Sequence, residues 1–198
     1  VQERRLGANE FSPHGTIILA GNRQIDRAGV QPDPSHLVDR ITRINVVSSF
    51  DDWVIWANEH GIRSEIIAFL RFRPGFFSKF DPGATKNATP RGWAKVSTLL
   101  NIGFTDNEVN MAAIAGQVGS GPAVDFYGFL RIWQGLPDID AMIRDPDKAR
   151  MPDADKPDVV YATCGAIAAK TTHDNAANVY KLSKKFSPEL GAVLMLDA

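Results

Sequence analysis

From Ser49 onward the sequence repeats one pattern, in which apolar residues recur at helical spacing and glycine or proline closes each segment. Ser49 can cap a helix whose first turn carries Asp51 and Asp52, because carboxylates are favourable at the positive end of a helix dipole. Thr89 followed by Pro90 signals another helix start. The predicted helices span 50–60, 64–73, 90–100, 105–116, 120–134, 156–170 and 174–185. Most of this chain is therefore predicted to be helical.

The first 48 residues have a different character. Residues 1–15 read as the tail of a helix followed by a turn-rich hairpin. Thr16–Ala20 is a short apolar run between glycines, as expected for a strand buried on both faces. Ile41–Ser48 alternates apolar and polar residues and predicts a second strand, and the final GAVLMLDA (191–198) predicts a short terminal one.

These segments predict an α/β part of two or three strands followed by a predominantly α-helical region. We expect three parts: the α/β part at 1–48, a helical segment at 49–104 and a further helical region at 105–198. The aromatic residues of the middle segment are predicted to pack its core; they are Trp53, Trp56, Phe69, Phe72, Phe76, Phe77, Phe80 and Trp93.

Composition narrows the functional classes. The chain has 198 residues, a formal net charge of −1 and 44% hydrophobic residues, which suits a packed globular core. Near-zero net charge disfavours binding to nucleic acid by bulk electrostatics, although a local basic patch stays open. The single cysteine, Cys164, excludes an internal disulfide and a cysteine-based zinc site.

The sequence also bears on where the protein is located. It contains no apolar run long enough to span a membrane and no signal-peptide pattern, so we expect a cytoplasmic protein. The start at Val1 without methionine predicts a fragment or a processed chain.

Asn22 is the first candidate site residue, because it follows directly on the predicted strand at 16–20. The carboxyl ends of strands in open α/β sheets line the ligand crevice, and an amide offers both a donor and an acceptor to a water or a phosphate oxygen. The alternative is an Asx-turn that only ends the strand. Taken alone, Asn22 favours the turn.

Three arginines extend this set. Arg40 ends a short predicted helix and Arg43 begins the next predicted strand. A guanidinium at such a position could serve as an arginine finger on the nucleotide of a neighbouring subunit. The alternative for both is a surface ion pair with Asp26 or Asp39. Arg91 lies in the first turn of a predicted helix, where a cation is unfavourable. Its position indicates either an anionic partner or simple exposure to solvent.

Taken in the order in which they occur along the chain, Gly21-Asn22, Leu37–Arg40 and Thr89–Arg91 resemble motifs in the C-terminal part of an AAA+ ATPase. The resemblance is closest to the MoxR-like branch of that family. The resemblance covers roughly residues 1–100. Four motifs carry it: the Arg4–Gly7 hairpin segment, Gly21-Asn22 as sensor 1, Leu37–Arg40 as the arginine-finger motif and Thr89–Arg91 as sensor 2 of the helical lid. The helices after residue 105 would extend the lid.

The resemblance implies roles for the candidate residues. Asn22 would position the attacking water, and Arg40 would stabilise transition-state charge across a subunit interface, with Arg43 as the alternative finger. Arg91 would contact the γ-phosphate of ATP and couple the lid to it. The whole protein would bind ATP and Mg²⁺, assemble as a homo-oligomeric ring and remodel a macromolecular partner.

The departures from the family pattern concern the phosphate-binding half. These 198 residues contain no G-x-x-x-x-G-K-[ST] sequence and no acidic pair ahead of Gly21-Asn22. VLMLDA (193–198) lies after the lid and is in the wrong order for a Walker-B strand. Because the phosphates and Mg²⁺ are held by the half that carries these motifs, this chain alone is expected to bind ATP weakly or not at all.

Two other functional classes compete with the ATPase interpretation. One is a non-enzymatic helical module that binds a protein partner. The other is nucleic-acid binding through residues 105–130, which the acidic Asp106, Glu108 and Asp125 disfavour. The four histidines lack metal-ligand spacing, so no metal site is predicted.

Overall fold

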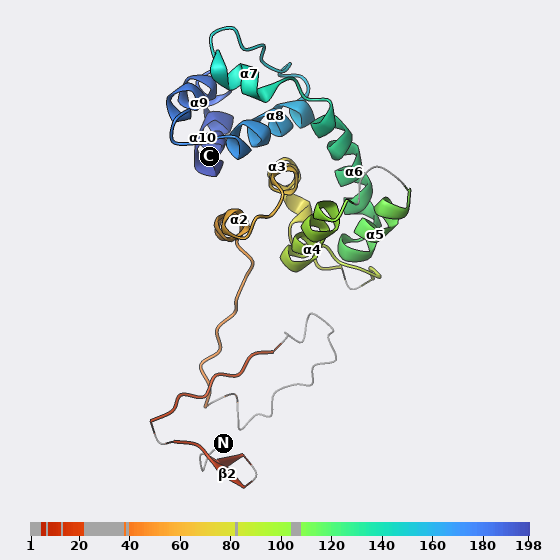
Figure 1. Ribbon diagram of the computed structural model, residues 1–198. Helices are drawn as coiled ribbons and strands as arrows, with labels where there is room; N and C mark the ends of the chain where they lie inside the picture. Colours follow the sequence, from red (N-terminus) through yellow and green to blue (C-terminus); the bar gives the residue numbers. More distant parts are fainter. Residues whose placement is uncertain are drawn as a thin grey trace. The chain divides into compact units, whose positions relative to one another are not determined.

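The computed structural model describes the chain as two units (Figure 1). The described residues are 5–6, 8–12, 14–21, 38, 40–81, 83–103 and 108–198. Unit 1 is Val1–Ile44 and unit 2 is Asn45–Ala198. The regions predicted at 49–104 and 105–198 both fall within unit 2.

Unit 1 contains a small hairpin. Strands β1 (Arg5–Leu6) and β2 (Asn9–Glu10) pair antiparallel, with Arg5 opposite Glu10 and Leu6 opposite Asn9. The turn-rich hairpin predicted within residues 1–15 is confirmed. The helix tail predicted ahead of it is wrong at Arg5–Leu6, because these residues pair as strand β1. Strands β1 and β2 are the only strands among the described residues.

The strands predicted at 16–20 and 41–48 are wrong for this structure. Neither segment forms a strand, and the side chains of Ile18 and Val46 are 86% and 88% exposed. A strand needs a neighbour to complete its backbone hydrogen bonds. The described residues give Thr16–Ala20 no backbone hydrogen bond, so its apolar pattern lacks the partner that would make it a strand.

Unit 2 is helical, and the prediction of a predominantly α-helical chain is confirmed. Its described elements are α2 (Phe50–Glu59), α3 (Ser64–Phe72), the 3₁₀ helix η2 (Pro74–Phe76), α4 (Pro90–Asn101), α5 (Glu108–Val118), α6 (Ser120–Gln134), α7 (Ile139–Arg144), α8 (Pro157–Ala169), α9 (Ala176–Ser183) and α10 (Pro188–Asp197). No helix among the described residues is long and apolar enough to cross a membrane.

Local signals start and stop these helices as predicted. The Ser49 side chain accepts a hydrogen bond from the Asp52 backbone N–H at 3.3 Å and caps α2. The Thr89 side chain accepts one from the Gly92 N–H at 3.0 Å and caps α4. Gly61 follows α2 with a φ of 65°, a left-handed conformation that glycine adopts without steric cost.

The terminal strand predicted at 191–198 is wrong, because this segment is helix α10. Ser187 caps it by accepting a hydrogen bond from the Leu190 N–H at 3.4 Å. Gly191 approaches the Ser183 carbonyl so closely that an added Cβ would lie 2.6 Å from its oxygen. Leu194 is buried, and α10 packs against α8 and α9. The apolar run therefore forms a helix that packs on two others, and it does not pair as a strand.

Helix α3 lies in the middle of unit 2, beside α6 and α8 (Figure 1). Its Phe69 ring lies 5.5 Å from Trp93 of α4 and 5.2 Å from Phe126 of α6, measured between ring centroids. Helices from the two regions predicted at 49–104 and 105–198 therefore share one core. The predicted aromatic core is confirmed except for Trp56 and Phe80, which are 39% and 49% exposed.

Gly165 provides a test of how closely α3 and α8 pack. An added Cβ at Gly165 would lie 2.4 Å from the Cβ of Ala68. Real side chains do not approach so closely, so Gly165→Ala must push the two helices apart. We expect it to lower the free energy of unfolding by about 2 kcal/mol, measured by urea denaturation.

Gly128→Ala is the matched control, because the structure leaves open space around a Cβ at that helical position. This substitution should be neutral or slightly stabilising, since alanine favours helix more than glycine does. Equal stability of the two variants would contradict the close packing of α3 on α8.

Candidate functional site

Arg91 is the candidate site residue whose surroundings are best defined. It is exposed in the first turn of α4, directly after the capping Thr89 and Pro90. No acidic residue lies in that turn, and no described residue forms an ion pair with Arg91. The guanidinium therefore points to solvent at the helix end that attracts anions.

The start of α4 is held rigidly. An added Cβ at Gly92 would lie 2.6 Å from the Gln117 carbonyl oxygen, so α4 packs directly on the end of α5. Trp93 is fully buried, and its Nε1–H donates to the Phe76 carbonyl at 2.8 Å. The backbone around Arg91 is thus fixed on both sides.

The loop before α4 is also folded back on itself. The Asp81 N–H donates to Asn87 Oδ1 at 2.8 Å, and Asn87 Nδ2 donates to the Asp81 carbonyl at 3.2 Å. An added Cβ at Gly119, whose φ is 92°, would lie 2.8 Å from the Lys86 carbonyl oxygen. The loop therefore lies against the α5–α6 junction and carries Lys86 with it.

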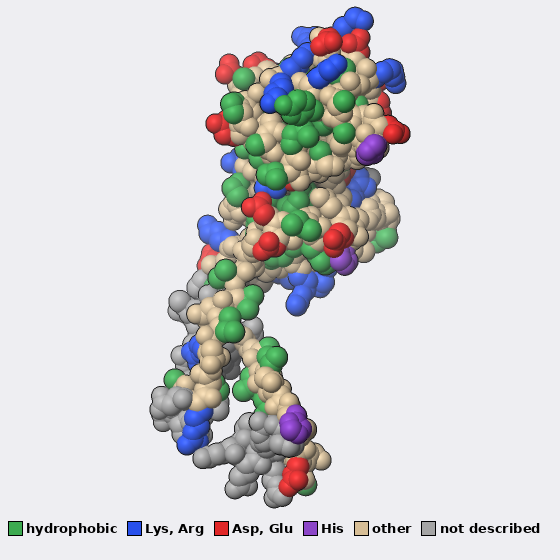
Figure 2. All heavy atoms as spheres, turned by 90° about the vertical axis from the view of Figure 1, so that its left-hand side faces the viewer, with side chains coloured by type: hydrophobic (Ala, Val, Ile, Leu, Met, Phe, Trp, Pro, Cys, Tyr) green, Lys and Arg blue, Asp and Glu red, His purple; other side chains and the backbone are tan. Residues whose placement is uncertain are grey.

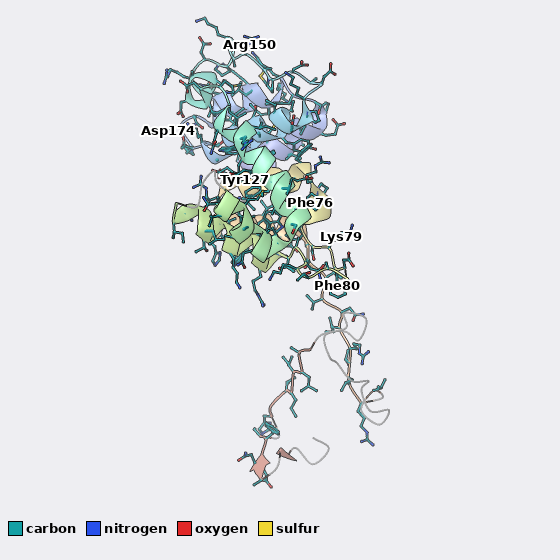
Figure 3. All side chains as sticks on the ribbon, turned by 90° about the vertical axis from the view of Figure 1, so that its right-hand side faces the viewer. Phe76, Lys79, Phe80, Tyr127, Arg150 and Asp174 are labelled. Carbon is teal, nitrogen blue, oxygen red and sulfur yellow. The ribbon has the colours of Figure 1, made fainter. Side chains whose placement is uncertain are left out.

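Positive charge gathers along this loop and α4. Residues 75–103 contain four cations and one carboxylate, and all four cations are exposed; they are Lys79, Lys86, Arg91 and Lys95. Figure 3 shows Lys79 beside Phe80 at one end of the helical unit. By contrast, the face of unit 2 in Figure 2 carries both signs interleaved. We call the four cations the basic surface.

The remaining predicted site residues belong to unit 1. Arg40 lies in a turn and Arg43 in a segment without regular secondary structure, and both are exposed. Asn22 lies outside the described residues. Arg40 and Arg43 therefore belong to a different unit from Arg91.

Sequence reasoning missed the buried ion pairs of unit 2. Glu65 is 6% exposed and pairs with Arg63, and Arg71 pairs with the nearly buried Asp197. The Arg71–Asp197 pair joins residues far apart in the chain, so no local pattern could reveal it. Among the described residues, no three His, Cys, Asp or Glu side chains gather as a metal site.

The chain was compared with protein-family models, curated proteins and solved structures, and no match was found in any of the three comparisons.

Proposed function

We propose that this chain carries sensor 1, the arginine finger and the sensor-2 lid of a MoxR-like AAA+ ATPase. In this proposal Asn22 positions the attacking water, Arg40 or Arg43 acts on the nucleotide of a neighbouring subunit, and Arg91 contacts the γ-phosphate. The whole protein hydrolyses ATP as a ring and uses the energy to remodel a macromolecule.

The observation that carries the proposal is the setting of Arg91. Its guanidinium projects from a capped, rigidly packed helix start, without a carboxylate partner among the described residues. Three exposed lysines of the same loop and helix complete the basic surface. A polyphosphate is a fitting ligand for such a surface, because phosphate oxygens accept hydrogen bonds from arginine and lie favourably at helix N-termini.

The exposed apolar residues of the two predicted strands at 16–20 and 41–48 give a second line of support. Ile18, Leu19, Ile44, Val46 and Val47 are each at least 68% exposed. Apolar side chains in such numbers normally lie in a core. In the proposed ATPase these segments are strands, and neighbouring strands of the nucleotide-binding half cover them.

The chain's own residues bind and orient the nucleotide in this proposal but do not hold it alone. Within these 198 residues there is no phosphate-cradling loop, so ATP and Mg²⁺ would be held by other segments of the whole protein. We expect no saturable ATP binding by residues 1–198 alone at micromolar nucleotide.

Arg91→Ala in the complete protein tests the sensor-2 role. We expect ATP turnover to fall at least about tenfold, because a cation on the transferred phosphate is lost. Lys95→Ala is the matched control: it removes a cation one turn along the same exposed helix face and should keep turnover within about twofold of wild type. Steady-state phosphate release is the measurement. Full turnover in Arg91→Ala would reject the sensor-2 assignment.

The same assay separates the two finger candidates. Arg40→Ala should abolish turnover in the assembled ring while leaving nucleotide binding intact, because a finger acts on the neighbouring subunit's transition state. Loss of turnover in Arg43→Ala alone would transfer the role to Arg43. Wild-type turnover in both variants would reject the finger assignment.

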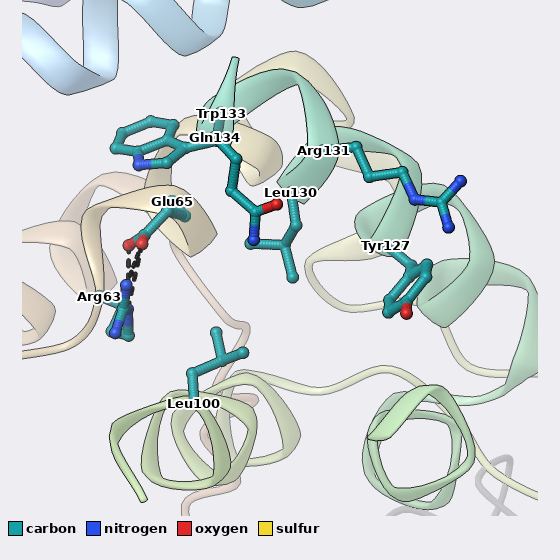
Figure 4. Close-up of a pocket in the computed structure, with 8 residues that line it drawn as sticks. All are labelled: Arg63, Glu65, Leu100, Tyr127, Leu130, Arg131, Trp133 and Gln134. Carbon is teal, nitrogen blue, oxygen red and sulfur yellow. Dashed lines mark hydrogen bonds and ion pairs between the residues drawn. The ribbon is translucent and has the colours of Figure 1, made fainter. Parts of the chain in front are cut away.

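A non-enzymatic interaction module is the second candidate function. The observation that favours it is a cleft of about 230 Å³ on unit 2 (Figure 4), whose apolar lining comes from Leu100, Leu130 and Trp133. If the complete protein neither binds nor hydrolyses ATP, the module is the better description of this chain.

A further inference from the structure

Phe80 is an exposed aromatic residue on the loop that carries Lys79 and Lys86. Its side chain is 49% exposed, and Figure 3 shows it at one end of the helical unit. The neighbouring Phe76 packs into the core, where it stacks on Phe69. Among the described residues, no other ring stacks on Phe80. Part of this ring is therefore open to a ligand.

The fold of the loop brings this ring and two cations to neighbouring stretches of backbone. The Asp81 N–H donates to Asn87 Oδ1 at 2.8 Å, and the Asp81 carbonyl accepts from Asn87 Nδ2 at 3.2 Å. Lys79 and Phe80 come just before one of these partners, and Lys86 comes just before the other. An aromatic ring and two ammonium groups therefore share one small part of the surface.

The described residues do not neutralise the basic surface. None of its four cations forms an ion pair with them. Asp81 is the only carboxylate of this stretch, and its Oδ1 accepts a hydrogen bond from the Gly83 N–H at 2.8 Å within a tight turn. The loop lies against the α5–α6 junction, and residues 109–124 around that junction contain no charged side chain. The basic surface therefore keeps a net positive charge, although the whole chain is nearly neutral.

From these observations we infer that the basic surface, together with Phe80, binds single-stranded nucleic acid. The cations pair with phosphates along the strand, and an unpaired base stacks on the Phe80 ring. Such stacking accepts any base, because every base has a flat π-face. Binding is therefore expected to show little dependence on sequence and a strong dependence on salt.

The exposed ring selects a single strand over other polyanions. In a duplex the bases stack on one another and present only their edges in the grooves, so no base face reaches Phe80. An acidic peptide supplies negative charge but no flat ring for the stack. Proteins that bind single strands without sequence preference combine positive charge along the strand with exposed aromatic side chains, and this surface offers both.

This inference gives the proposed ATPase a class of macromolecular partner, but it does not rest on ATP hydrolysis. Binding of the strand is measured without nucleotide, and the variants below change Phe80 and Lys86, to which the ATPase proposal gives no catalytic role. Arg91 belongs to both proposals and is therefore left unchanged. Failure of the binding test would leave the ATPase proposal standing, and the reverse also holds.

The probe is a fluorescein-labelled oligothymidine of twenty nucleotides, to which residues 1–198 are added while fluorescence anisotropy is followed. We expect saturable binding with a Kd on the order of 10 μM in 50 mM NaCl. If three or four phosphates are neutralised, log Kd rises with log salt at a slope of about 2 to 3. The Kd should then increase about 20- to 50-fold between 50 and 200 mM NaCl.

Two variants separate the contribution of charge from that of the ring. Lys86→Glu should weaken binding at least about tenfold and lower the salt slope by about 1, because a phosphate contact is lost. Phe80→Leu should weaken binding at least about fivefold and leave the salt slope unchanged, because only the stacking is lost.

Arg150→Glu is the matched control for Lys86→Glu, because both change the net charge of the chain by the same amount. Arg150 is exposed and lies at the opposite end of unit 2 from Lys79 and Phe80 (Figure 3). Its reversal should change the Kd by less than about twofold. Thermal melting of the three variants should match wild type, because all three side chains are exposed.

Two competing ligands complete the test. The same oligothymidine annealed to its oligoadenosine complement, and a poly-glutamate peptide of twenty residues, should both bind more weakly than the single strand, since neither offers an unpaired base to Phe80.

Four results would overturn the inference. The first is the absence of saturable binding in 50 mM NaCl. The second is equal weakening by Arg150→Glu and Lys86→Glu, which would indicate attraction by overall charge. The third is wild-type affinity in Phe80→Leu, which would remove the stacked base. The fourth is binding of the duplex or of poly-glutamate as tight as that of the single strand, which would assign the basic surface to another polyanion.

Discussion

Replacing Arg71 by methionine is expected to lower the free energy of unfolding by about 3 kcal/mol. Arg71 of α3 donates to Asp197 of α10 through Nε at 3.1 Å and through Nη2 at 2.7 Å. The side chains of Arg71 and Asp197 are only 15% and 9% exposed. Methionine fills the space but leaves the Asp197 carboxylate buried without its cation.

The surroundings of this pair explain the size of the effect. Burial lowers the pKa of Arg71, but the hydrogen bonds and charges of Asp197 and Asp51 outweigh it and raise the pKa overall. Burial, together with the charge of Asp197, raises the pKa of the nearby Cys164 thiol to about 12. Asp51 is 79% exposed and contributes little. The stabilisation therefore resides mainly in the Arg71–Asp197 contact.

Urea denaturation followed by circular dichroism gives the measurement, and Arg73→Met is its matched control. Arg73 lies two residues further on, is 53% exposed and approaches Asp125 only to 3.9 Å. Its loss should change stability by less than about 0.5 kcal/mol. Equal losses in the two variants would contradict the buried pair.

A double variant checks the mechanism. Arg71→Met combined with Asp197→Leu replaces both charges by apolar side chains, so no carboxylate stays unpaired. We expect most of the lost stability to return, because well-packed apolar residues often replace a buried ion pair without cost. A double variant as unstable as Arg71→Met would show that packing, and not the unpaired charge, causes the loss.

Trp93→Ala is expected to cost about 4 kcal/mol of folding free energy. The Trp93 side chain is fully buried and packs edge-on against Phe126, with ring centroids 5.4 Å apart. Its Nε1–H donates to the Phe76 carbonyl. Alanine leaves a large cavity at the centre of α3, α4 and α6 and removes this hydrogen-bond donor.

Trp56→Ala is the control for Trp93→Ala, because it removes the same group from a partly exposed position. Trp56 is 39% exposed and stacks on His60 of the same helical segment. Its loss should cost about 1 kcal/mol in urea denaturation. If the two tryptophan variants lose the same stability, Trp93 is not the core residue that the structure describes.

The Trp93 variant also bears on the candidate site, because Arg91 precedes it by two residues. Loosening of the first turn of α4 would move the guanidinium that we propose as sensor 2. In the complete protein, Trp93→Phe should therefore retain more ATP turnover than Trp93→Ala, since the phenyl ring still fills most of the space.

Local signals in the sequence were enough to predict most helices and the place of Arg91. The predicted helix at 120–134 has the same bounds as α6, and Thr89 and Pro90 start α4 as expected. Capping and helical spacing act within one or two turns of the chain, so neighbouring residues determine them. The same local signals put Arg91 in the first turn of α4.

Apolar pattern alone did not decide between strand and helix. GAVLMLDA was predicted as a strand and is part of α10, where a capping Ser187 and contact with α9 make it a helix. TIILA was predicted as a buried strand and lies exposed without a backbone partner among the described residues. A short apolar run suits either structure, and the neighbours it packs against select one.

By itself, therefore, the sequence determined where most helices lie, although not α7 or α10, and which arginine stands at the start of α4. Only the tertiary structure decided which side chains meet across the fold. The Arg71–Asp197 pair spans 126 residues, and the cleft between α3, α4 and α6 draws its lining from three helices. Contacts between residues so distant in the chain depend on how helices pack, and helix packing has no signature within a single segment.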